Sequence, residues 1–387
     1  MRKGVYHPGC ALAIRGTTPY VEACAIVRDG VVSRSTTGPL RDGGLDLALA
    51  ISLRPADAAL AEREDFAELD GHDVLQAVCD ALATLGSVRV WNTTTMGPAD
   101  IARERPPDLI FNLAEGLSGS GREAQAPALF EWLQWPYVGS DPVTLAIAHD
   151  KWHTKRILVA DGISTPAARL VQQPLDADLI DLRYPLIVKP VAEGSGKGIH
   201  EDDVVVSPAA LRATARRKLA RYQQPVIVEE FLPGRELTVA VIGNTGAWEV
   251  LPLVEVNFPA LGAGSHRVYG YEAKWARPTP DDLLCPAPVP DGLRKDVEAL
   301  AMATCDALRI RDWARVDVRL GSDDRPYVLD VNPLPGIMPG VEDISCFTRS
   351  AFAAGMTYEG MIRRLVESAR ARYASDSFQS YRVARKR

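Results

Sequence analysis

Cysteine is scarce in this sequence, and its spacing suggests no shared site. Six cysteines occur in 387 residues, and no two of them form a C-x-x-C pair. In a chain of this length, scattered cysteines favour reduced thiols over a disulfide framework. The sequence therefore predicts a cytoplasmic protein without structural cross-links.

Long apolar runs and basic stripes are absent as well. The apolar run CALAI near the start is five residues long, which is too short for the hydrophobic region of a secretory signal. No uninterrupted apolar run approaches the roughly 20 residues of a membrane-spanning helix. The formal net charge is −6, and basic side chains are dispersed. We therefore expect neither a membrane nor a nucleic acid as partner.

The composition is that of a globular protein with two or three domains. Hydrophobic residues make up 47% of the chain and charged residues 24%, which is enough to bury a sizeable core. From residue 45 to about 145, strand-like segments alternate with helical ones, and residues 72–85 show the clearest helical spacing. This alternation predicts a parallel α/β domain. Residues 1–44 carry only short candidate strands and are interpreted as an N-terminal extension.

The segment from Arg315 to Gly336 is the most informative. Residues 314–320 and 327–332 alternate in side-chain character around the turn-like GSDDRP, which predicts a β-hairpin. Strand pairing would gather four polar side chains on one surface: Arg315, Asp317, Asp330 and Asn332. Carboxylate and amide oxygens suit Mg²⁺, although a merely solvated face would show the same pattern.

Two further stretches have the composition of a nucleotide site. Residues 185–199 form an apolar strand that reaches Lys189 and then a loop with three glycines and Ser195. Such a loop can present amides to phosphate oxygens, but it is not a Walker A motif, and a hairpin tip is the structural alternative. Residues 225–237 begin with an apolar strand that ends in Glu229-Glu230. Phe231 and Leu232 come next, and Glu236 lies further on. Acids and an apolar wall at a strand end can hold adenosine, or they can simply be solvated.

Three other patterns leave their interpretation open. Residues 119–124 fit G-x-G-x-x-A, a dinucleotide fingerprint, but no acidic residue ends the next strand, and a glycine-rich turn lining a small-molecule cleft fits better. His149 and His153 have the i, i+4 spacing of metal ligands in a segment, 146–160, that looks helical. No third ligand is evident nearby, so surface or core histidines are the favoured interpretation. Residues 257–276 form a long irregular segment that is typical of a lid.

Taken together, these stretches resemble the ATP-grasp ligases, and within them the D-alanine–D-alanine ligase family. The likeness runs from about residue 46 to 370 and rests on segments in family order: DLIFNLAEG, PYVGS, PLIVKP…EGSGKG, VIVEEFLPGRE, YEAKW, ARVDV and LDVNPLPG. The resemblance implies an ATP-grasp fold of the α/β (α+β) class, with a parallel α/β domain and two subdomains with antiparallel sheets. Its expected divisions are 1–44, 45–145, 146–224, 225–373 and a basic tail at 374–387.

The resemblance also implies roles for individual residues. ATP phosphates would meet Lys151, Lys189 and the loop residues Glu193, Ser195 and Gly196. The adenosine would meet Glu229, Glu230, Phe231, Leu232 and Glu236. Two Mg²⁺ ions, or Mn²⁺ in their place, would be held by Asp317, Asp330 and Asn332. Arg315 would stabilise an oxyanion, Lys274 would act from the lid together with Ser195, and Gly336 and Ser345 would meet the carboxylate of the amine substrate.

Departures from the family pattern concentrate on the first-substrate side. The Gly-Ser-Glu signature after the first strand is missing, the usual His-Gly is Glu115-Gly116, and the lid tyrosine is Trp275. Glu115 and Arg122 are therefore the expected contacts of an altered carboxylate donor. We expect an ADP-forming ligase that joins a small carboxylate to an amino acid, as a homodimer if it assembles as family members do. The alternatives are D-alanine–D-alanine synthesis for peptidoglycan and a non-catalytic ATP-binding protein.

Overall fold

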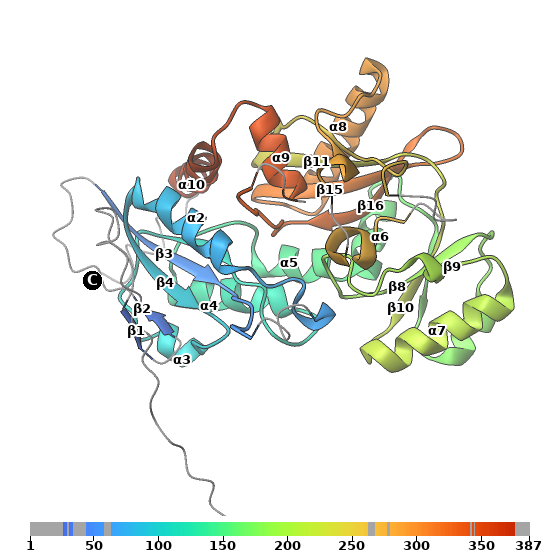
Figure 1. Cartoon of the computed structure of the whole chain (residues 1–387), viewed down its shortest axis with the longest axis horizontal. Coiled ribbons are helices and arrows are strands. Elements are labelled where there is room, and N and C mark those ends of the chain that lie inside the picture. Colours follow the sequence, from blue (N-terminus) through green and yellow to red (C-terminus); the bar gives the residue numbers. More distant parts are fainter. Residues whose placement is uncertain are drawn as a thin grey trace, which may run out of the picture.

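The computed structural model describes residues 26–28, 31–33, 44–57, 63–261, 268–276, 279–340, 343 and 345–375. An α/β unit is followed by two units built on antiparallel sheets (Figure 1). Two strands of the expected extension, β1 (Ile26–Arg28) and β2 (Val31–Ser33), pair antiparallel. The rest of that extension, and the basic tail from residue 376 on, lie outside the described residues.

The N-terminal unit is the predicted parallel α/β domain. Its sheet has the order β4-β3-β5-β6, with every neighbouring pair parallel. The strands are β3 (Leu45–Ile51), β4 (Gly86–Asn92), β5 (Leu109–Leu113) and β6 (Tyr137–Val138). The helices are α2 (His72–Ala83), α3 (Pro98–Ile101) and α4 (Gln125–Leu133), with 3₁₀ turns η1 (Glu64–Phe66) and η2 (Arg122–Ala124).

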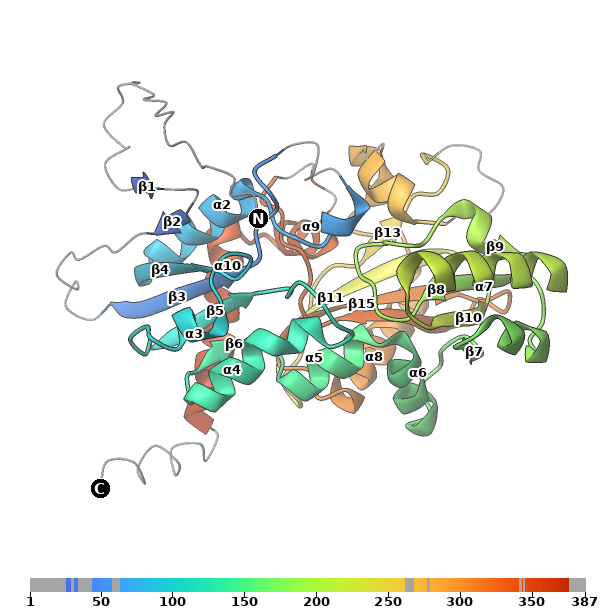
Figure 2. The same cartoon turned by 90° about the horizontal axis from the view of Figure 1, so that it is seen from below.

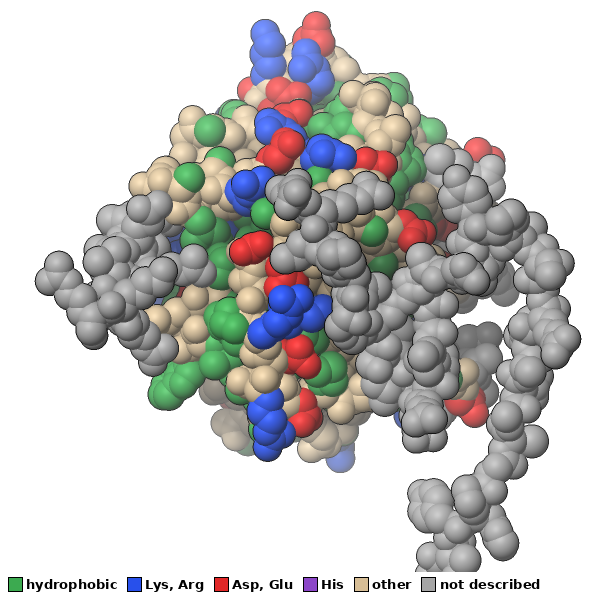
Figure 3. All heavy atoms as spheres, turned by 90° about the vertical axis from the view of Figure 1, so that its left-hand side faces the viewer, with side chains coloured by type: hydrophobic (Ala, Val, Ile, Leu, Met, Phe, Trp, Pro, Cys, Tyr) green, Lys and Arg blue, Asp and Glu red, His purple; other side chains and the backbone are tan. Residues whose placement is uncertain are grey.

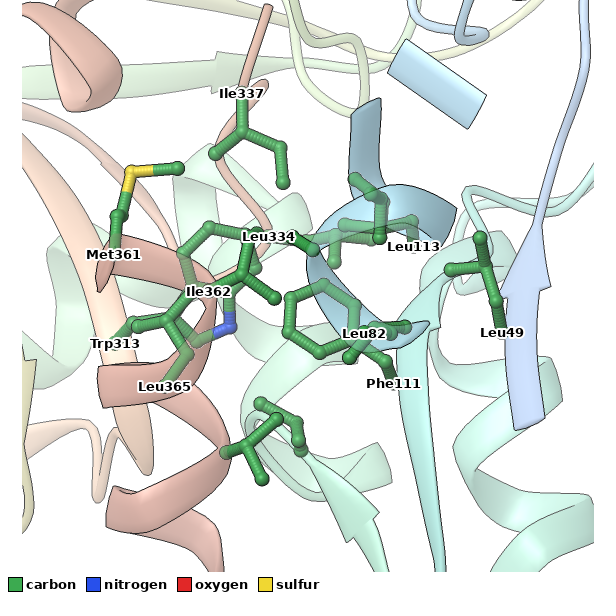
Figure 4. Close-up of a cluster of buried hydrophobic side chains, with 14 of the residues drawn as sticks. Leu49, Leu82, Phe111, Leu113, Trp313, Leu334, Ile337, Met361, Ile362 and Leu365 are labelled. Atoms are coloured by element: carbon green, nitrogen blue, oxygen red, sulfur yellow. The ribbon is translucent and has the colours of Figure 1, made fainter. Parts of the chain in front are cut away.

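The alternation of β3 explains how both faces of this sheet are covered. Leu47 and Leu49 pack with α2 and with the C-terminal helix α10 (Tyr358–Ser375), whereas Ala48 and Ala50 face α3 and α4. Successive strand residues point to opposite faces, so the two helical layers follow from this one strand. Figure 4 shows residues of β3, α2, β5, β15 and α10 meeting in a single cluster. The N-terminal and C-terminal units therefore share a core.

The central unit holds a second sheet, of order β7-β10-β8-β9 and entirely antiparallel. Its elements are α5 (Pro142–His149), α6 (Lys151–Ala160), β7 (Ala168–Val171), η3 (Pro174–Leu179), β8 (Leu186–Pro190), η4 (Glu201–Asp203), β9 (Val204–Val205), α7 (Pro208–Tyr222) and β10 (Val226–Glu230). Val188, Val226 and Val228 pack under α7. The expected division at 224/225 would separate β10 from its sheet, so the sheet itself ends at Glu230.

The spacing of residues 146–160 predicted a single helix, but the structure has two. Asp150 is extended (φ −92°, ψ 100°) and separates α5 from α6. Its carboxylate accepts a hydrogen bond from the amide of His153 and caps the second helix. An aspartate N-cap of this kind satisfies an amide that the new helix leaves unpaired.

The C-terminal unit is built on a six-stranded antiparallel sheet of order β14-β13-β11-β15-β16, with β12 also paired to β11. Its elements are β11 (Glu236–Gly243), β12 (Glu249–Val250), β13 (Val254–Val256), η5 (Glu272–Ala276), η6 (Pro280–Asp282), β14 (Leu283–Leu284), α8 (Asp291–Ala307), β15 (Asp312–Leu320), β16 (Pro326–Asn332) and α9 (Cys346–Ala353). In Figure 2, β11 and β15 lie beside β8 and β10 of the central sheet. This is the arrangement expected of an ATP-grasp fold.

The predicted hairpin is confirmed as β15 and β16, but its alternation is not regular. Arg315 pairs with Asn332 and Asp317 with Asp330, as expected. The register then shifts, so that Val318 pairs with Val328 and Leu329 is skipped. Such a bulge breaks the two-residue period. Val328 is therefore buried in the core instead of sharing the face of Asp330.

The surface and the thiols agree with the composition. On the face of the N-terminal unit in Figure 3, basic and acidic side chains are interleaved. Four cysteines lie in the described part of the chain, Cys79, Cys285, Cys305 and Cys346, and none of them forms a disulfide there; Cys10 and Cys24 lie outside it. None of the helices that the structure describes is long and apolar enough to cross a membrane.

Candidate active site

A cavity between the central and C-terminal sheets collects the residues expected to bind ATP and metal. It is lined by Lys151, Lys189, Glu193, Ser195, Gly196, Glu229, Glu230, Phe231, Leu232, Glu236, Lys274, Arg315, Asp317, Asp330 and Asn332. These residues come from α6, β8, β10, β11, the lid segment and the hairpin. The fold therefore brings together stretches separated by up to 180 residues of sequence.

Lysines and a buried carboxylate form the floor of this cavity. Glu229 is fully buried and pairs with Lys189 Nζ at 2.8 Å and with Lys155 Nζ at 3.3 Å. Burial opposes its ionisation, but Lys155 and Lys189 outweigh burial and hold the pKa of Glu229 below its ordinary value. Lys155 was not singled out from the sequence. The lysine pair gives the floor a net positive charge, as phosphate oxygens require.

The opposite wall combines apolar and acidic groups. Phe231 and Leu232 supply apolar surface, and the Phe231 ring lies 4.8 Å from the Arg319 guanidinium carbon. Arg319 Nη1 also donates to Glu236 at 2.9 Å. Burial raises the pKa of Glu236 despite this arginine. An apolar wall with one polar group at its edge is the form expected of a site for a base and a ribose.

The glycine-rich loop is held in a conformation that favours glycine. Ser195 has φ +52° and Gly196 has φ +76°, and a side chain on Gly196 would come within 3.2 Å of the Gly270 carbonyl carbon. The lid segment therefore packs directly on this loop. Carboxylates of the N-terminal unit take two loop amides: Glu68 accepts from Gly194, and Glu64 accepts from Gly198 at 2.8 Å.

Three oxygen-bearing side chains of the hairpin lie together where metal ions were expected. Asp317 pairs with Arg315 Nη2 at 3.0 Å, Asp330 with Lys151 Nζ at 3.2 Å, and the Asn332 amide lies 3.4 Å from Asp317 Oδ2. In the described part of the chain, no cluster of three His, Cys, Asp or Glu side chains could hold a metal alone. Two carboxylates and one amide are nevertheless hard donors, and they fit Mg²⁺ that is shared with phosphate oxygens.

Arg315 and Lys274 face the same space from the sheet and from the lid. Arg315 Nε is buried and has no hydrogen-bond partner among the described residues, while its Nη2 pairs with Asp317. Lys274 Nζ lies 5.1 Å from the centre of the Tyr269 ring. Burial, and then the nearby Arg315, lower the pKa of Lys274. Two adjacent cations that repel each other are suited to an anion placed between them.

A second cavity adjoins the first and contains the expected substrate residues Glu115, Arg315, Gly336 and Ser345. Ser345 Oγ donates to the Gly336 carbonyl at 2.6 Å. The residues between these two positions in the sequence therefore do not keep them apart. Seven residues line both cavities: Ser195, Glu236, Tyr269, Lys274, Arg315, Asp317 and Asn332.

Carboxylates surround one part of the second cavity. Glu115 is joined there by Glu68, Asp70, Asp73 and Glu123. Burial, followed by the nearby Glu123, raises the pKa of Glu115 well above its ordinary value. Burial also raises the pKa of Asp70 to about 7, although Arg54 acts against this rise. Sequence reasoning missed Asp70 and Glu68, because they lie in an irregular segment with no motif.

Arg122 does not line this second cavity, contrary to its expected role at the donor. Its Nη2 pairs with Glu68 at 2.6 Å and with Glu193 at 3.2 Å, and its Nη1 donates to the Ala192 carbonyl at 3.1 Å. The guanidinium is buried and engaged on several sides. Its contacts favour a structural role that ties η2 to the glycine-rich loop.

The two histidines of the HDKWH motif lie on different helices and do not share a ligand. His149 Nδ1 lies 2.6 Å from Glu123 Oε1, and His153 Nδ1 lies 2.9 Å from Asp150 Oδ2. His149 is buried, whereas the His153 side chain is 58% exposed. The alternative of one core and one surface histidine therefore describes the motif.

Comparison with known proteins shows which family this chain belongs to. Residues 167–367 match the family model described as D-ala D-ala ligase C-terminus. A D-alanine–D-alanine ligase of Cupriavidus metallidurans is 35% identical over 266 residues, which are 68% of this chain and 76% of that protein. The chain belongs to the D-alanine–D-alanine ligase family. The resemblance read from the sequence is thus confirmed.

Further similar proteins agree with this assignment to the D-alanine–D-alanine ligase family. The D-alanine–D-alanine ligase of Gloeobacter violaceus is 34% identical over 302 residues, covering 76% of this chain and 92% of that protein. An uncharacterised protein of Sinorhizobium fredii is 33% identical over 280 residues, covering 70% and 80%. The crystal structure of D-alanine–D-alanine ligase from Bacillus anthracis has a TM-score of 0.63 at 22% identity, covering 86% and 100%. This structural likeness supports the ATP-grasp fold.

Proposed function

We propose that this protein is an ATP- and Mg²⁺-dependent carboxylate–amine ligase that works through an acyl phosphate. The observation that carries the proposal is the wall shared by the two cavities. Lys274, Arg315, Asp317 and Asn332 line both, so the phosphate end of one site meets the substrate site. A non-catalytic ATP-binding protein would not need an arginine and a lysine at that junction.

The residues of the junction suit the two chemical steps. Lys151 and Lys189 would bind phosphate oxygens, and Lys274 would meet the phosphoryl group as it transfers to the donor carboxylate. Asp317, Asp330 and Asn332 would hold Mg²⁺, which neutralises phosphate charge when bound. Arg315 would stabilise the oxyanion that forms when the amine attacks the acyl carbon. Ser345 and Gly336 would position the carboxylate of the attacking amino acid.

A nucleotide assay tests this reaction type. Attack on the γ-phosphate yields ADP and phosphate, in amounts that match the amide formed. Purified protein would be incubated with ATP, Mg²⁺ and a matrix of amino acids, with phosphate release and product mass measured together. Stoichiometric AMP would contradict the acyl phosphate and indicate an adenylate.

For the donor, we propose a compound that carries a cationic or hydrogen-bonding group facing Glu115 and Asp70. Neither carboxyl group has a side-chain hydrogen-bond partner in the described part of the chain, and both line the substrate cavity. A site built around buried polar groups rejects analogues that lack the matching group. D-Alanine, with a methyl side chain, should therefore be a poor donor, and we place the reaction in a specialised biosynthetic pathway.

Steady-state kinetics with D-alanine alone would decide between this donor and the cell-wall reaction. The contact between Ser345 and Gly336, and the names of the relatives, favour D-alanine–D-alanine synthesis as the second candidate. A kcat/KM for D-alanine within the roughly 10⁴–10⁸ M⁻¹s⁻¹ typical of natural substrates would establish that candidate. Lysine, ornithine and serine of both configurations, tested as donors with D-alanine as acceptor, are the informative comparison.

A further inference from the structure

A buried carboxylate–imidazole pair beside the substrate cavity has no part in the roles described so far. Glu123 belongs to η2, and His149 is the last residue of α5. The Nδ1–Oε1 distance is 2.6 Å, and the His149 side chain is 3% exposed. Its Nε2 is buried without a hydrogen-bond partner among the described residues. An unpaired nitrogen in this position is unusual enough to require an explanation.

The pair lies against the reaction site, not on the protein surface. Glu123 lines the substrate cavity. His149 lines a cavity of about 20 Å³ behind it, together with Lys151 and Asp330. Four residues line both cavities and so form the partition between them: Glu123, Gly194, Asn332 and Leu334. Glu123 is therefore a neighbour of the glycine-rich loop and of a proposed metal ligand.

The proposed reaction needs a proton acceptor at this point. An amino acid enters as an ammonium ion, which has no lone pair and cannot attack the acyl carbon. Three carboxylates near the partition already have cationic or amide partners. Glu68 accepts from Arg122, Glu193 accepts from Gln224 and pairs with Arg122 and Lys197, and Asp330 pairs with Lys151. Glu123 is the carboxylate of the partition whose only recorded side-chain partner in the described structure is an imidazole.

We propose that Glu123 is the general base that deprotonates the amine substrate and that His149 positions its carboxylate. The inference rests on the ligase function proposed above. An N–H bond of the ammonium breaks, and the proton passes to Glu123. The freed lone pair forms the C–N bond at the acyl carbon, the C–O bond to phosphate breaks, and the second amine proton leaves with the phosphate. In this role His149 would donate Nδ1–H to Glu123 Oε1, which leaves the other carboxylate oxygen for the substrate amine.

Hydroxylamine separates this role from a structural one. At neutral pH it is largely uncharged, so it captures an acyl phosphate as a hydroxamate without help from a base. Two rates would be measured with the donor that gives most ADP in the amino-acid matrix: hydroxamate formation with hydroxylamine and amide formation with D-alanine. The Glu123→Gln variant should lose about 10²-fold or more in amide formation, while hydroxamate formation should stay within a few-fold of wild type.

Matched variants of His149 extend the test. His149→Asn keeps an N–H near the position of Nδ1 and should retain most amide formation, whereas His149→Phe should lower the ratio of amide to hydroxamate. His153→Gln, in the exposed histidine of the same motif, is the control and should leave both rates unchanged. Thermal unfolding would be recorded for each variant to confirm that it folds.

Three results would overturn the proposal. Equal losses of hydroxamate and amide in Glu123→Gln would mean that the pair only supports the fold or the donor site. Unchanged amide formation in folded Glu123→Gln would mean that another group takes the proton, and an unchanged ratio of amide to hydroxamate in folded His149→Phe would mean that His149 does not position Glu123. If the wild-type protein forms neither ADP nor hydroxamate with any donor, it is the proposed ligase function that fails.

Discussion

At the scale of single residues, the hairpin oxygens carry the most direct prediction. Asp317→Ala and Asn332→Ala each remove a proposed Mg²⁺ ligand, so turnover should fall by orders of magnitude. Both side chains line the cavity, and the fold should persist. Amide formation at saturating Mg²⁺ and the thermal midpoint would be measured for each variant. Near-normal turnover in either one would rule out the metal assignment.

Asp70 yields a prediction about pH. Its pKa of about 7 in the folded protein exceeds the value near 3.9 of an unfolded chain. The folded state therefore binds this proton more tightly than the unfolded chain. The contribution of protonated Asp70 to the free energy of unfolding is complete below about pH 4 and is lost as the pH rises to about 7. Asp70→Asn stays neutral throughout. Its free energy of unfolding should exceed that of wild type by up to about 4 kcal/mol at pH 8 and match it at pH 4.

Denaturant unfolding at the two pH values would test this difference. The comparison within one variant removes effects of the amide that do not depend on pH. An equal difference between wild type and Asp70→Asn at pH 4 and pH 8 would contradict the raised pKa.

Sequence reasoning found residues that belong to regular elements or to ordered motifs. Asp317, Asp330 and Asn332 were predicted because strand pairing fixes their common face. Asp70 and Glu123 were not, because an irregular segment and a short 3₁₀ turn bring them to the cavity. Arg122 was predicted to contact the donor substrate, and this prediction failed for a related reason. A spacing along the chain does not reveal that Glu68, 54 residues away, will pair with it.

At the scale of elements, Trp275 is one of the residues that hold the lid on the glycine-rich loop, next to the backbone bond from Tyr271 to Ile199. Trp275 Nε1 donates to the Ser195 carbonyl at 3.0 Å, and the Arg54 guanidinium carbon lies 5.0 Å from the Trp275 ring centre. Trp275→Phe keeps a ring for Arg54 but loses the hydrogen bond. A net loss of about 0.5–1.5 kcal/mol should raise the KM for ATP by roughly 2- to 13-fold.

A conservative change elsewhere provides the comparison for this lid prediction. Trp132 on α4 is 86% exposed, and Trp132→Phe should leave the KM for ATP unchanged. Trp275→Ala, which also loses the contact with Arg54, should have a larger effect than Trp275→Phe. An unchanged KM in both Trp275 variants would mean that the lid closes without this contact.

Helices and strands with a clear period were predicted well, and their irregularities were not. The helix at residues 72–85 and the hairpin appear as expected. The break at Asp150 and the skipped Leu329 do not follow from periodicity, because each depends on a local contact. Asp150 caps a helix that must change direction, and Leu329 is displaced by a bulge that lets Val328 reach the core.

At the scale of the whole molecule, the N-terminal and C-terminal units are joined by a shared core and by a buried ion pair. The cluster in Figure 4 joins α2 and β5 to β15 and α10. Beside it, Asp312 is fully buried and accepts from the Gly139 amide at 2.8 Å and from Arg372 at 2.7 Å. The N-terminal strand β6, the hairpin strand β15 and the last helix therefore meet at one ion pair.

Breaking this pair should destabilise the whole protein. Arg372 also donates to the Tyr137 carbonyl at 3.0 Å, so Arg372→Ala removes bonds to two units and leaves the Asp312 charge buried. Removing one partner of a buried pair typically costs about 3–5 kcal/mol. Arg370→Ala, on the exposed face of the same helix, should stay within about 0.5 kcal/mol of wild type. Adding Asp312→Asn to the Arg372→Ala variant should restore part of the lost stability, because the second substitution removes the unpaired charge. Thermal and denaturant unfolding would measure all three variants, and a stability of Arg372→Ala equal to that of Arg370→Ala would show that the shared hydrophobic core alone joins the units.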